Sequence, residues 1–307
     1  MFALAFLATA LGTAELPSQP PISFPNWIGI RMREQAGHVY VAHVLRQSPA
    51  LCGGLRDGDE ILKVSARAVH TPHQASTLIA VSAARPLPMQ IARNGARIDL
   101  ALTPAVRPTD GEIARLDLIG TTMPALHTLE AVRGEAPTVA ALSGHVVLVE
   151  HGASWCGPCR ESARDLEALR KSYPPTTLVV LGVTRESGNV AGAYAQHVAR
   201  PDGVDAGHAG TNVRKPFSVL RDVSGDVSGG ASVSLLPTFV LYGPEGTARW
   251  VHAGGGASLS LMLNAQVRSA MVPLSARVQP ASLPNRDACG QLIAPRAIQS
   301  VRSAGQE

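Results

Sequence analysis

Residues 145–160 read His145-Val-Val-Leu-Val-Glu-His-Gly-Ala-Ser-Trp-Cys-Gly-Pro-Cys-Arg160, and this stretch decides the fold of the second half of the chain. It opens with a β-branched, apolar run, residues 145–149, that has the length of a buried strand. A helical pattern follows the two cysteines, with its apolar positions on one face; these positions are Cys159, Ala163, Leu166 and Leu169. Pro174 and Pro175 end the helix, and residues 178–181 begin another strand. The sequence therefore predicts a strand–helix–strand unit with both cysteines where the helix begins.

The position of the two cysteines favours redox chemistry. Backbone N–H groups at a helix N-terminus are unpaired and the helix dipole favours negative charge there, so we expect the Cys156 thiol to have a lowered pKa. A thiol whose pKa lies close to the ambient pH attacks disulfides best. Cys159, one turn into the helix, is expected to be better buried and to attack the resulting mixed disulfide. Pro158 would fix the turn between them, and Trp155 would shield the sulfurs from solvent.

Half of a zinc site is the alternative interpretation of two cysteines at this spacing. A structural zinc site needs two further ligands, but Cys52 and Cys289 are isolated, and His70 and His73 stand at the start of an expected helix. We therefore predict no metal, and no cofactor besides a redox-active Cys156–Cys159 disulfide. Cys52 and Cys289 are expected to be free, buried thiols; a bridge between them is the alternative if the protein is exported.

The region from 110 to 272 resembles the thioredoxin family, whose best-known motif is Trp155-Cys-Gly-Pro-Cys159. Its layout is similar to that of the exported, TlpA-like group, through Met123-Pro-Ala-Leu126, Leu142-Ser-Gly-His-Val-Val-Leu-Val149 and Leu235-Leu-Pro-Thr-Phe-Val-Leu-Tyr242. The resemblance implies an α/β thioredoxin fold, in which helices flank a mixed central sheet. It also implies that Pro237 is a cis-proline that faces the cysteines and helps to hold the substrate backbone.

Glu150 stands six residues before Cys156, where thioredoxins carry a buried acid beneath the second cysteine. Burial raises the pKa of a carboxyl group, which can then take the proton of Cys159. The alternative is a glutamate that turns outward at the end of the strand. His151 and Gly152 replace the two aromatic residues that are usual after this acid, which predicts thinner packing near the site.

The first part of the chain, residues 27–106, predicts a small β-rich domain. Strands are expected at residues 27–31 and 38–45, and Asn94-Gly95 between two further strand-like segments is a strong hairpin signal. Thr71 can cap a helix that begins at Pro72. The residues expected on the buried side of that helix are Leu78, Ile79 and Val81.

This region resembles a PDZ domain of the bacterial, protease-associated kind. The resemblance rests on Trp27-Ile-Gly-Ile30 and on Ser48-Pro-Ala-Leu-Cys-Gly-Gly-Leu-Arg-Asp-Gly-Asp-Glu-Ile-Leu62. It implies that Ile28, Gly29 and Ile30 form a loop whose backbone N–H groups hold the C-terminal carboxylate of a peptide, which adds as a strand beside it. The helix after Thr71 would form the other wall of this groove. The alternative is that the glycine serves only the turn and the domain is a spacer.

The composition is that of a globular protein. Of the 307 residues, 45% are hydrophobic and 16% charged, and the formal charge is only +4, with scattered arginines. This distribution argues against nucleic acid as a partner. Residues 1–14 are a candidate signal peptide, apolar and ending in small residues but without a basic start; a buried segment of a cytoplasmic protein is the alternative. A Pro-rich lead-in at 15–26 and an irregular tail at 273–307 complete the predicted organisation.

These features together predict a thiol–disulfide oxidoreductase that acts in the periplasm or elsewhere outside the cytoplasm. Its partners would be protein thiols and disulfides, a thiol electron donor and, through the PDZ-like groove, peptide C-termini. The Gly-Pro pair between the cysteines is typical of reducing thioredoxins, so reduction of exported proteins is the expected direction. The rival hypothesis is a PDZ-led, peptide-binding adaptor in which Cys156 and Cys159 form a redox sensor.

Overall fold

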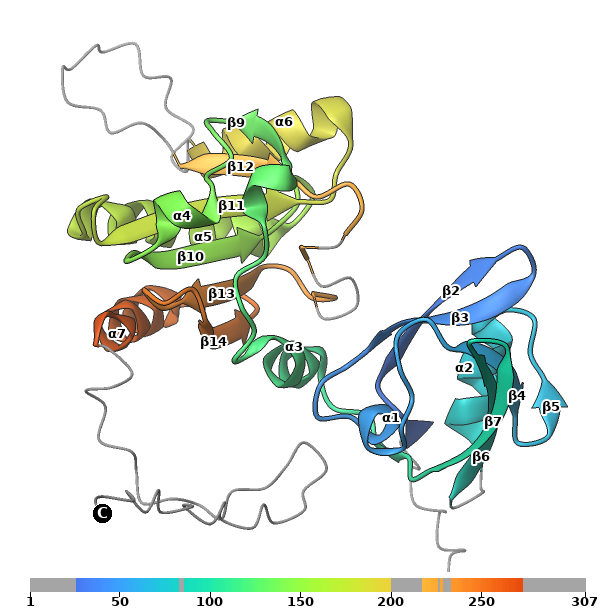
Figure 1. The fold of residues 1–307 in the computed structure, drawn as a ribbon. Coiled ribbons are helices and arrows are strands. Elements are labelled where there is room, and N and C mark those ends of the chain that lie inside the picture. Colours follow the sequence, from blue (N-terminus) through green and yellow to red (C-terminus); the bar gives the residue numbers. More distant parts are fainter. Residues whose placement is uncertain (1–25, 83–85, 200–216, 226, 229–232, 273–307) are drawn as a thin grey trace, which may run out of the picture.

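The computed structural model describes residues 26–82, 86–199, 217–225, 227–228 and 233–272, which form an N-terminal lobe (26–106) and a C-terminal lobe (110–272) (Figure 1). The candidate signal peptide, the lead-in up to residue 25, the tail and Cys289 lie outside the described residues. Within the described part of the chain, no helix combines the length and apolar character needed to cross a membrane.

The N-terminal lobe is an antiparallel sheet of order β2-β3-β4-β6-β7, with β5 paired to β4. Its core gathers apolar side chains from the sheet and from α2. A separate two-stranded ladder joins β1 to β8. The elements are β1 (Asn26–Trp27), β2 (Ile30–Gln35), β3 (His38–Val44), α1 (Pro49–Cys52), β4 (Glu60–Val64), β5 (Arg67–Ala68), α2 (Pro72–Val81), β6 (Leu87–Arg93), β7 (Ala96–Leu102) and β8 (Ala105–Val106).

Most of the predicted local signals in this lobe are confirmed, with two corrections. The Asn94-Gly95 turn joins β6 to β7, and the Thr71 side chain accepts the N–H of Gln74 at the start of α2. The strand expected at residues 27–31 is broken, because Gly29 adopts φ +77° between β1 and β2. Val81 was expected to be buried and is 72% exposed, since it lies in the last turn of α2, beyond the core contact made by Ile79.

The C-terminal lobe is built on a mixed sheet of order β14-β13-β10-β11-β12-β9. Strands β10, β11 and β12 are parallel, while β13 and β9 run antiparallel to their neighbours. The elements are α3 (Asp110–Leu118), the 3-10 turn η1 (Leu126–Thr128), β9 (Glu130–Arg133), α4 (Val139–Leu142), β10 (Val146–His151), α5 (Gly157–Ser172), β11 (Leu178–Thr184), α6 (Gly188–Ala199), β12 (Ser218–Arg221), β13 (Thr238–Tyr242), β14 (Ala248–Ala253) and α7 (Leu259–Met271).

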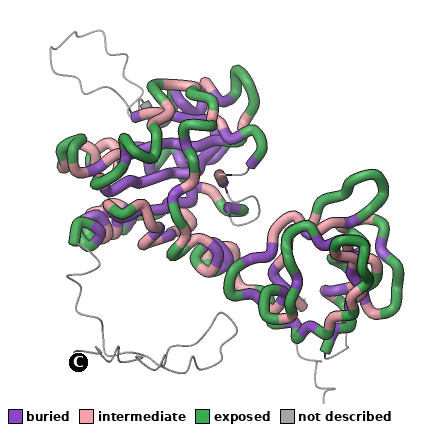
Figure 2. The backbone as a smooth tube through the Cα atoms, in the orientation of Figure 1, coloured by how far each residue is buried: buried purple, intermediate pink, exposed green. Residues whose placement is uncertain are grey.

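Strand β10 is buried on both faces because helices cover both sides of the sheet. Val146 and Leu148 pack with α5, α6 and α7, whereas Val147 and Val149 pack with α3, η1 and α4. In Figure 2 the central strands are correspondingly a continuous buried stretch. This two-sided burial explains the uninterrupted apolar run before Glu150 and predicts that any polar side chain continuing the strand is enclosed as well.

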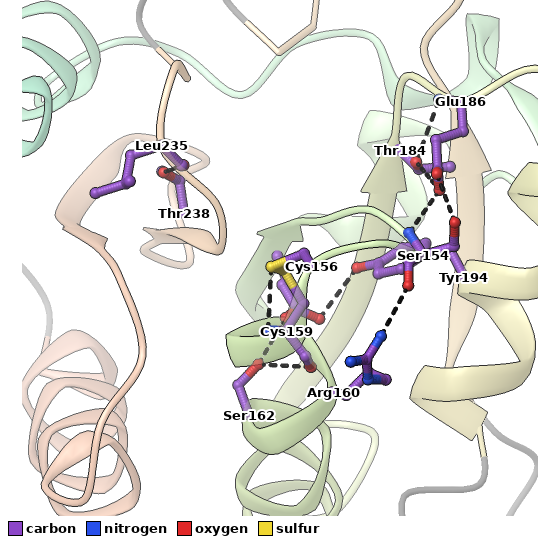
Figure 3. Close-up of a disulfide and its surroundings, with 11 residues drawn as sticks. Ser154, Cys156, Cys159, Arg160, Ser162, Thr184, Glu186, Tyr194, Leu235 and Thr238 are labelled. Atoms are coloured by element: carbon purple, nitrogen blue, oxygen red, sulfur yellow. Dashed lines mark hydrogen bonds between the residues drawn. A yellow bond between two sulfur atoms is a disulfide. The ribbon is translucent and has the colours of Figure 1, made fainter.

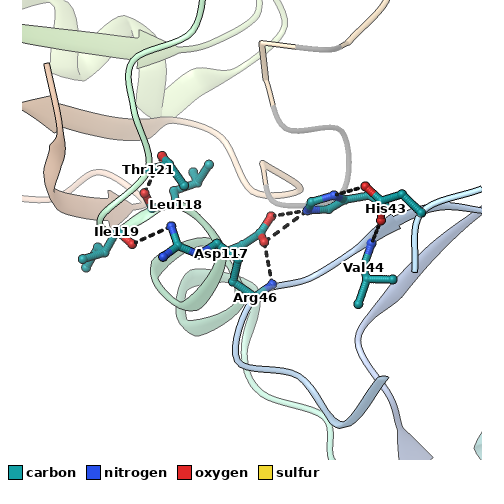
Figure 4. A network of polar contacts seen from close by, with 8 residues as sticks. His43, Val44, Arg46, Asp117, Leu118, Ile119 and Thr121 are labelled. Carbon is teal, nitrogen blue, oxygen red and sulfur yellow. Dashed lines mark hydrogen bonds and ion pairs between the residues drawn. The ribbon is translucent and has the colours of Figure 1, made fainter. Parts of the chain in front are cut away.

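The two lobes meet at α3, which packs along β14 and carries Asp117 in its last turn. The Asp117 carboxylate is buried and accepts Nε2 of His43 at 3.0 Å and the backbone N–H of Arg46 at 2.9 Å (Figure 4). The Arg46 guanidinium also donates to the Ile119 carbonyl at 3.3 Å. This polar contact holds the turn after β3 against the end of α3.

Candidate active site

A disulfide joins Cys156 and Cys159 at the N-terminus of α5. Cys156 is the N-cap residue, and the backbone N–H of Cys159 donates to its Sγ at 3.2 Å. Both side chains are almost fully covered, with 4% and 1% exposed, respectively. A helix N-terminus that donates directly to sulfur stabilises the thiolate of the reduced pair. The local geometry is therefore that of a buried disulfide at the start of a helix, where reduction would leave a stabilised Cys156 thiolate.

The apolar cover of the disulfide comes from Ala153 and Leu236, which pack against both cysteines. Trp155, predicted to shield the sulfurs, instead has 72% of its surface exposed. Pro158 occupies the first turn of α5 and packs closely against the backbone of Gly255. A Cβ added to Gly255 would lie 3.3 Å from the proline side chain. Trp155 is thus available for contact with a bound molecule.

Pro237 follows a cis peptide bond, as the resemblance implied, and Leu236 before it packs against the cysteines. The Pro237 carbonyl accepts the N–H of Gly254 at 2.7 Å, and the hydroxyl of Thr238 donates to the Leu235 carbonyl at 2.6 Å. Figure 3 shows Leu235 and Thr238 on one side of the disulfide and Ser154 and Glu186 on the other. The cysteines therefore lie between two loops, each fixed by its own hydrogen bonds.

Glu150, in β10, is completely buried and does not turn outward. Ser162 Oγ donates to its Oε1 at 2.9 Å, and the Tyr194 hydroxyl donates to its Oε2 at 3.1 Å. Burial raises the pKa of Glu150 to about 7, although these two hydrogen bonds act in the opposite direction. Ser162 Oγ also lies 2.9 Å from the Cys159 carbonyl oxygen, which ties the acid to the first turn of α5.

Tyr194 is the residue of this site that the sequence reasoning missed. Its ring lies over Gly152 and Gly182, where an added Cβ would come within 2.6 Å and 3.2 Å of it, respectively. The ring therefore fills the space left by the missing aromatic residue, and the expectation of thinner packing is wrong. The available signal was a lone tyrosine in the segment that forms α6, together with the glycine at a position where an aromatic residue is usual.

His151 and Glu186 complete the polar groups around the disulfide. His151 is 4% exposed, and burial lowers the pKa of its imidazole to about 4, so that it is neutral at pH 7. Glu186 accepts the Ser154 backbone N–H at 2.7 Å and the Ser154 hydroxyl at 2.6 Å. These bonds hold the loop between β10 and α5.

In the N-terminal lobe, the three residues expected to bind a peptide lie where β1 gives way to β2. Ile28 is buried and its carbonyl accepts the Ala50 N–H at 2.7 Å, while the Gly29 carbonyl accepts the Leu45 N–H at 2.9 Å. A Cβ on Gly29 would lie 2.3 Å from that of Ser48, so the close approach itself requires glycine. Ile30 begins β2, an outer strand of the described sheet.

Strand β2 and helix α2 both carry partly buried apolar side chains. Ile30 and Met32 belong to β2, and Leu78 belongs to α2. A sheet edge beside a helix can receive an extended peptide as an added strand. A sequence comparison agrees with this architecture, because the family model described as "PDZ domain" matches residues 27–103. Residues 27–103 are a PDZ domain.

The C-terminal lobe has the thioredoxin fold. Its sheet combines a parallel β10–α5–β11 unit with the antiparallel β13–β14 pair and α7, the disulfide begins α5, and a cis-proline precedes β13. No curated protein matches the chain in a sequence comparison.

Solved structures resemble each lobe in turn. One is a protein from Chlorobium tepidum assigned as a thiol:disulfide interchange protein DsbE, with 23% identity over 50% of this chain and 98% of its own, at a TM-score of 0.40. A secreted Mycobacterium tuberculosis disulfide oxidoreductase shares 21% identity over 46% of this chain and 93% of its own, at 0.36. The HtrA3 PDZ domain bound to a phage-derived ligand shares 25% identity over 26% and 86%, at 0.24.

The PDZ domain also contains the cysteine for which the sequence-based expectation fails. Cys52, at the end of α1, is exposed and disulfide-bonded, and no free cysteine is present in the described part of the chain. The expectation of two free, buried thiols is therefore wrong. Nothing in the local sequence indicated this, because the bonding of an isolated cysteine depends on which distant segment the fold brings to it.

Proposed function

We propose that this protein is a thiol–disulfide oxidoreductase that reduces disulfides of other proteins outside the cytoplasm. The observation that carries the proposal is the Cys156–Cys159 disulfide at the start of α5, with the buried acid Glu150 linked to the same helical turn through Ser162 and the Pro237 loop beside it. The candidate signal peptide at residues 1–14 supports action outside the cytoplasm.

The reaction begins from the reduced pair. The Cys156 thiolate attacks one sulfur of the substrate disulfide, which forms a mixed disulfide and releases the first substrate thiolate. Cys159 then gives its proton to Glu150 and attacks Sγ of Cys156, which releases the second substrate thiolate and forms the Cys156–Cys159 disulfide. Two electrons pass to the substrate, and its two thiolates take up protons, one of them supplied through Glu150. A thiol electron donor must then reduce the pair again.

The roles of the other predicted site residues follow from their positions. Pro158 fixes the first turn of α5, and Trp155 offers an exposed aromatic surface next to Cys156. The loop before Pro237 would hold the backbone of the substrate, because Leu236 reaches the cysteines. Because its pKa is about 7, Glu150 is ionised in about half of the molecules near pH 7. This suits a group that must accept a proton and give it up again.

The PDZ domain is proposed to capture the C-terminus of a substrate protein. Capture would raise the local concentration of the substrate disulfide near Cys156 without any new contact at the active site. The open edge of β2 beside α2 supports this role. It equally supports the adaptor function, in which peptide binding is the purpose and the cysteines only sense the redox state.

The deciding experiment measures the reduction potential of the pair against glutathione, together with insulin reduction by the wild type, Cys156→Ser and Cys159→Ser. A potential near that of thioredoxin, about −270 mV, with loss of turnover in both variants, is the result we expect. Absence of any thiol–disulfide exchange would contradict the enzyme and leave the adaptor. Peptide substrates with a free or an amidated C-terminus then test capture, since equal kcat/KM for the two would exclude it.

A further inference from the structure

Two hydroxyl groups from different helices hold the buried Glu150 carboxyl. Ser162 in α5 donates to Oε1 at 2.9 Å, and Tyr194 in α6 donates to Oε2 at 3.1 Å. All three side chains are buried. The residues paired with Glu150 across the sheet, Gly182 in β11 and Phe239 in β13, carry no charge. The protonation state of the carboxyl therefore acts directly on these two hydroxyls.

The Ser162 hydroxyl has two acceptors within reach but only one hydrogen. Its Oγ lies 2.9 Å from Oε1 of Glu150 and 2.9 Å from the carbonyl oxygen of Cys159. Figure 3 shows Ser162 beside Cys159 at the start of α5. An ionised carboxylate and a backbone carbonyl accept hydrogen bonds but donate none. The hydroxyl can therefore donate to only one of them at a time.

Each protonation state of Glu150 selects a different direction for the Ser162 hydrogen. The ionised carboxylate takes this hydrogen, because a hydrogen bond to a charged group is about twice as strong as a neutral one. A protonated Glu150 can instead donate through Oε1 to the serine oxygen, which frees the serine hydrogen for the Cys159 carbonyl. Both arrangements satisfy the buried groups, and the change between them moves hydrogens only.

We propose that Ser162 is a positioning residue for the transfer of the Cys159 proton to Glu150. Its hydroxyl donates to Glu150 while the acid is ionised, and to the Cys159 carbonyl once the acid has taken up the proton. The acid is thereby held in place before the transfer, and the first turn of α5 gains a hydrogen bond after it. The inference rests on the proposed function, because it concerns the proton acceptor of the same site.

The other titratable groups around this cluster keep their charge near neutral pH. Burial, and then the charges of Glu150 and Glu186, raise the pKa of Tyr194 well above its ordinary value. Burial lowers the pKa of His151, the next residue of β10, to about 4. The disulfide-bonded cysteines do not titrate. A change at this cluster in the oxidised protein near pH 7 is therefore the titration of Glu150, whose pKa is about 7.

The carbonyl carbon of Cys159 reports the position of the Ser162 hydrogen in the oxidised protein. Cysteine labelled with carbon-13 at the carbonyl and arginine labelled with nitrogen-15 give one joint NMR signal, because Cys159–Arg160 is the only Cys–Arg pair in the sequence. Between pH 5 and pH 9 we expect this carbonyl resonance to move upfield in the wild type, with a midpoint near pH 7, since the carbonyl loses a hydrogen bond. The movement should be at least threefold smaller in Ser162→Ala and absent in Glu150→Gln.

Ser172→Ala is the matched control. The Ser172 hydroxyl also donates to a backbone carbonyl of α5, that of Ala168 at 2.9 Å, but at the far end of the helix, so this variant should titrate like the wild type. A smaller loss of movement in Ser162→Ala, or a titration that persists in Glu150→Gln, would overturn the inference. A wild-type resonance that does not move near pH 7 would overturn it as well, whether or not the variants fold.

A single-turnover reaction of the reduced protein with one equivalent of 5,5′-dithiobis(2-nitrobenzoate) separates the inference from the proposed function. Attack by Cys156 releases the first thionitrobenzoate, and attack by Cys159 on the mixed disulfide releases the second. At pH 7, Ser162→Ala should slow only the second release, about threefold, because the lost bond to the ionised acid outweighs the lost neutral bond. An unchanged second release would overturn the role of Ser162 in the proton transfer. If the wild type releases neither, the proposed function itself has failed.

Discussion

Glu150 shows how one residue can couple the proposed chemistry to the stability of the fold. Its pKa is about 7 in the folded protein, raised by burial, against about 4.3 in an unfolded chain. The unfolded chain therefore loses this proton at a lower pH than the native state. The contribution of Glu150 to the free energy of unfolding is therefore largest below pH 4, falls as the pH rises, and is smallest above pH 7. The group that would accept the proton of Cys159 thus destabilises the oxidised protein at neutral pH.

We accordingly predict that Glu150→Gln stabilises the oxidised protein at pH 8 but not at pH 4. The gain should approach about 4 kcal/mol, from the difference between the two pKa values, and urea unfolding at the two pH values measures it. The same variant should resolve the mixed disulfide about a hundredfold more slowly, since the proton acceptor is lost. Equal stabilisation at both pH values would contradict the buried, titrating carboxyl.

Tyr194 should tune this acid rather than merely fill space. Tyr194→Phe keeps the ring over Gly152 but removes the hydroxyl that donates to Glu150 Oε2. Because that bond favours the ionised carboxylate, its loss should raise the pKa of Glu150 further and move the midpoint of the pH profile for mixed-disulfide resolution upward by about one pH unit. Tyr173→Phe, at the far end of α5, is the matched control, and an unchanged midpoint in Tyr194→Phe would exclude the tuning role.

At the scale of elements, α6 can approach β10 and β11 closely because two glycines face it. Gly152→Ala would place a Cβ 2.6 Å from the Tyr194 ring and force the helix or the ring to move. We expect a loss of about 1–3 kcal/mol of unfolding free energy, as for other overpacked cores, measured by denaturant titration. Gly192→Ala, in α6 with open space around it, should instead stabilise by up to about 1 kcal/mol. If Gly152→Ala loses little or no unfolding free energy, α6 does not pack tightly against β10 and β11.

The same elements show how far the sequence alone could lead. Helix α5, with its capping Cys156 and its buried face, and the β6–β7 hairpin were predictable because periodicity and turn residues are local signals. The contact of Tyr194 with Glu150 spans 44 residues, and that of His43 with Asp117 spans 74. Such pairs depend on how elements pack, which no local pattern records. The exposure of Val81 and the bonding of Cys52 were missed for the same reason.

At the scale of the whole molecule, the contact between the lobes contains a titratable pair. His43 donates to Asp117 through Nε2, while its Nδ1 lies 3.6 Å from an Asp57 oxygen. The hydrogen bond to Asp117 is the largest influence on the pKa of His43 and raises it. Burial and the positive charge of Arg31 lower this pKa, but the net shift is upward. In the folded protein the pKa of His43 exceeds its ordinary value of 6.5. The stabilisation from its protonated form is therefore complete below pH 6.5 and is lost as the pH rises through the raised pKa.

We therefore expect the PDZ domain to be held more firmly at pH 6 than at pH 8. Fluorescence energy transfer between one label in the PDZ domain and one in the thioredoxin fold should decrease between these pH values in the wild type. In His43→Gln, which keeps a hydrogen-bond donor but cannot become charged, the decrease should disappear. His73→Gln, an exposed histidine on α2, should behave like the wild type. A decrease of equal size in His43→Gln would mean that a titratable group other than His43 controls the contact between the two lobes.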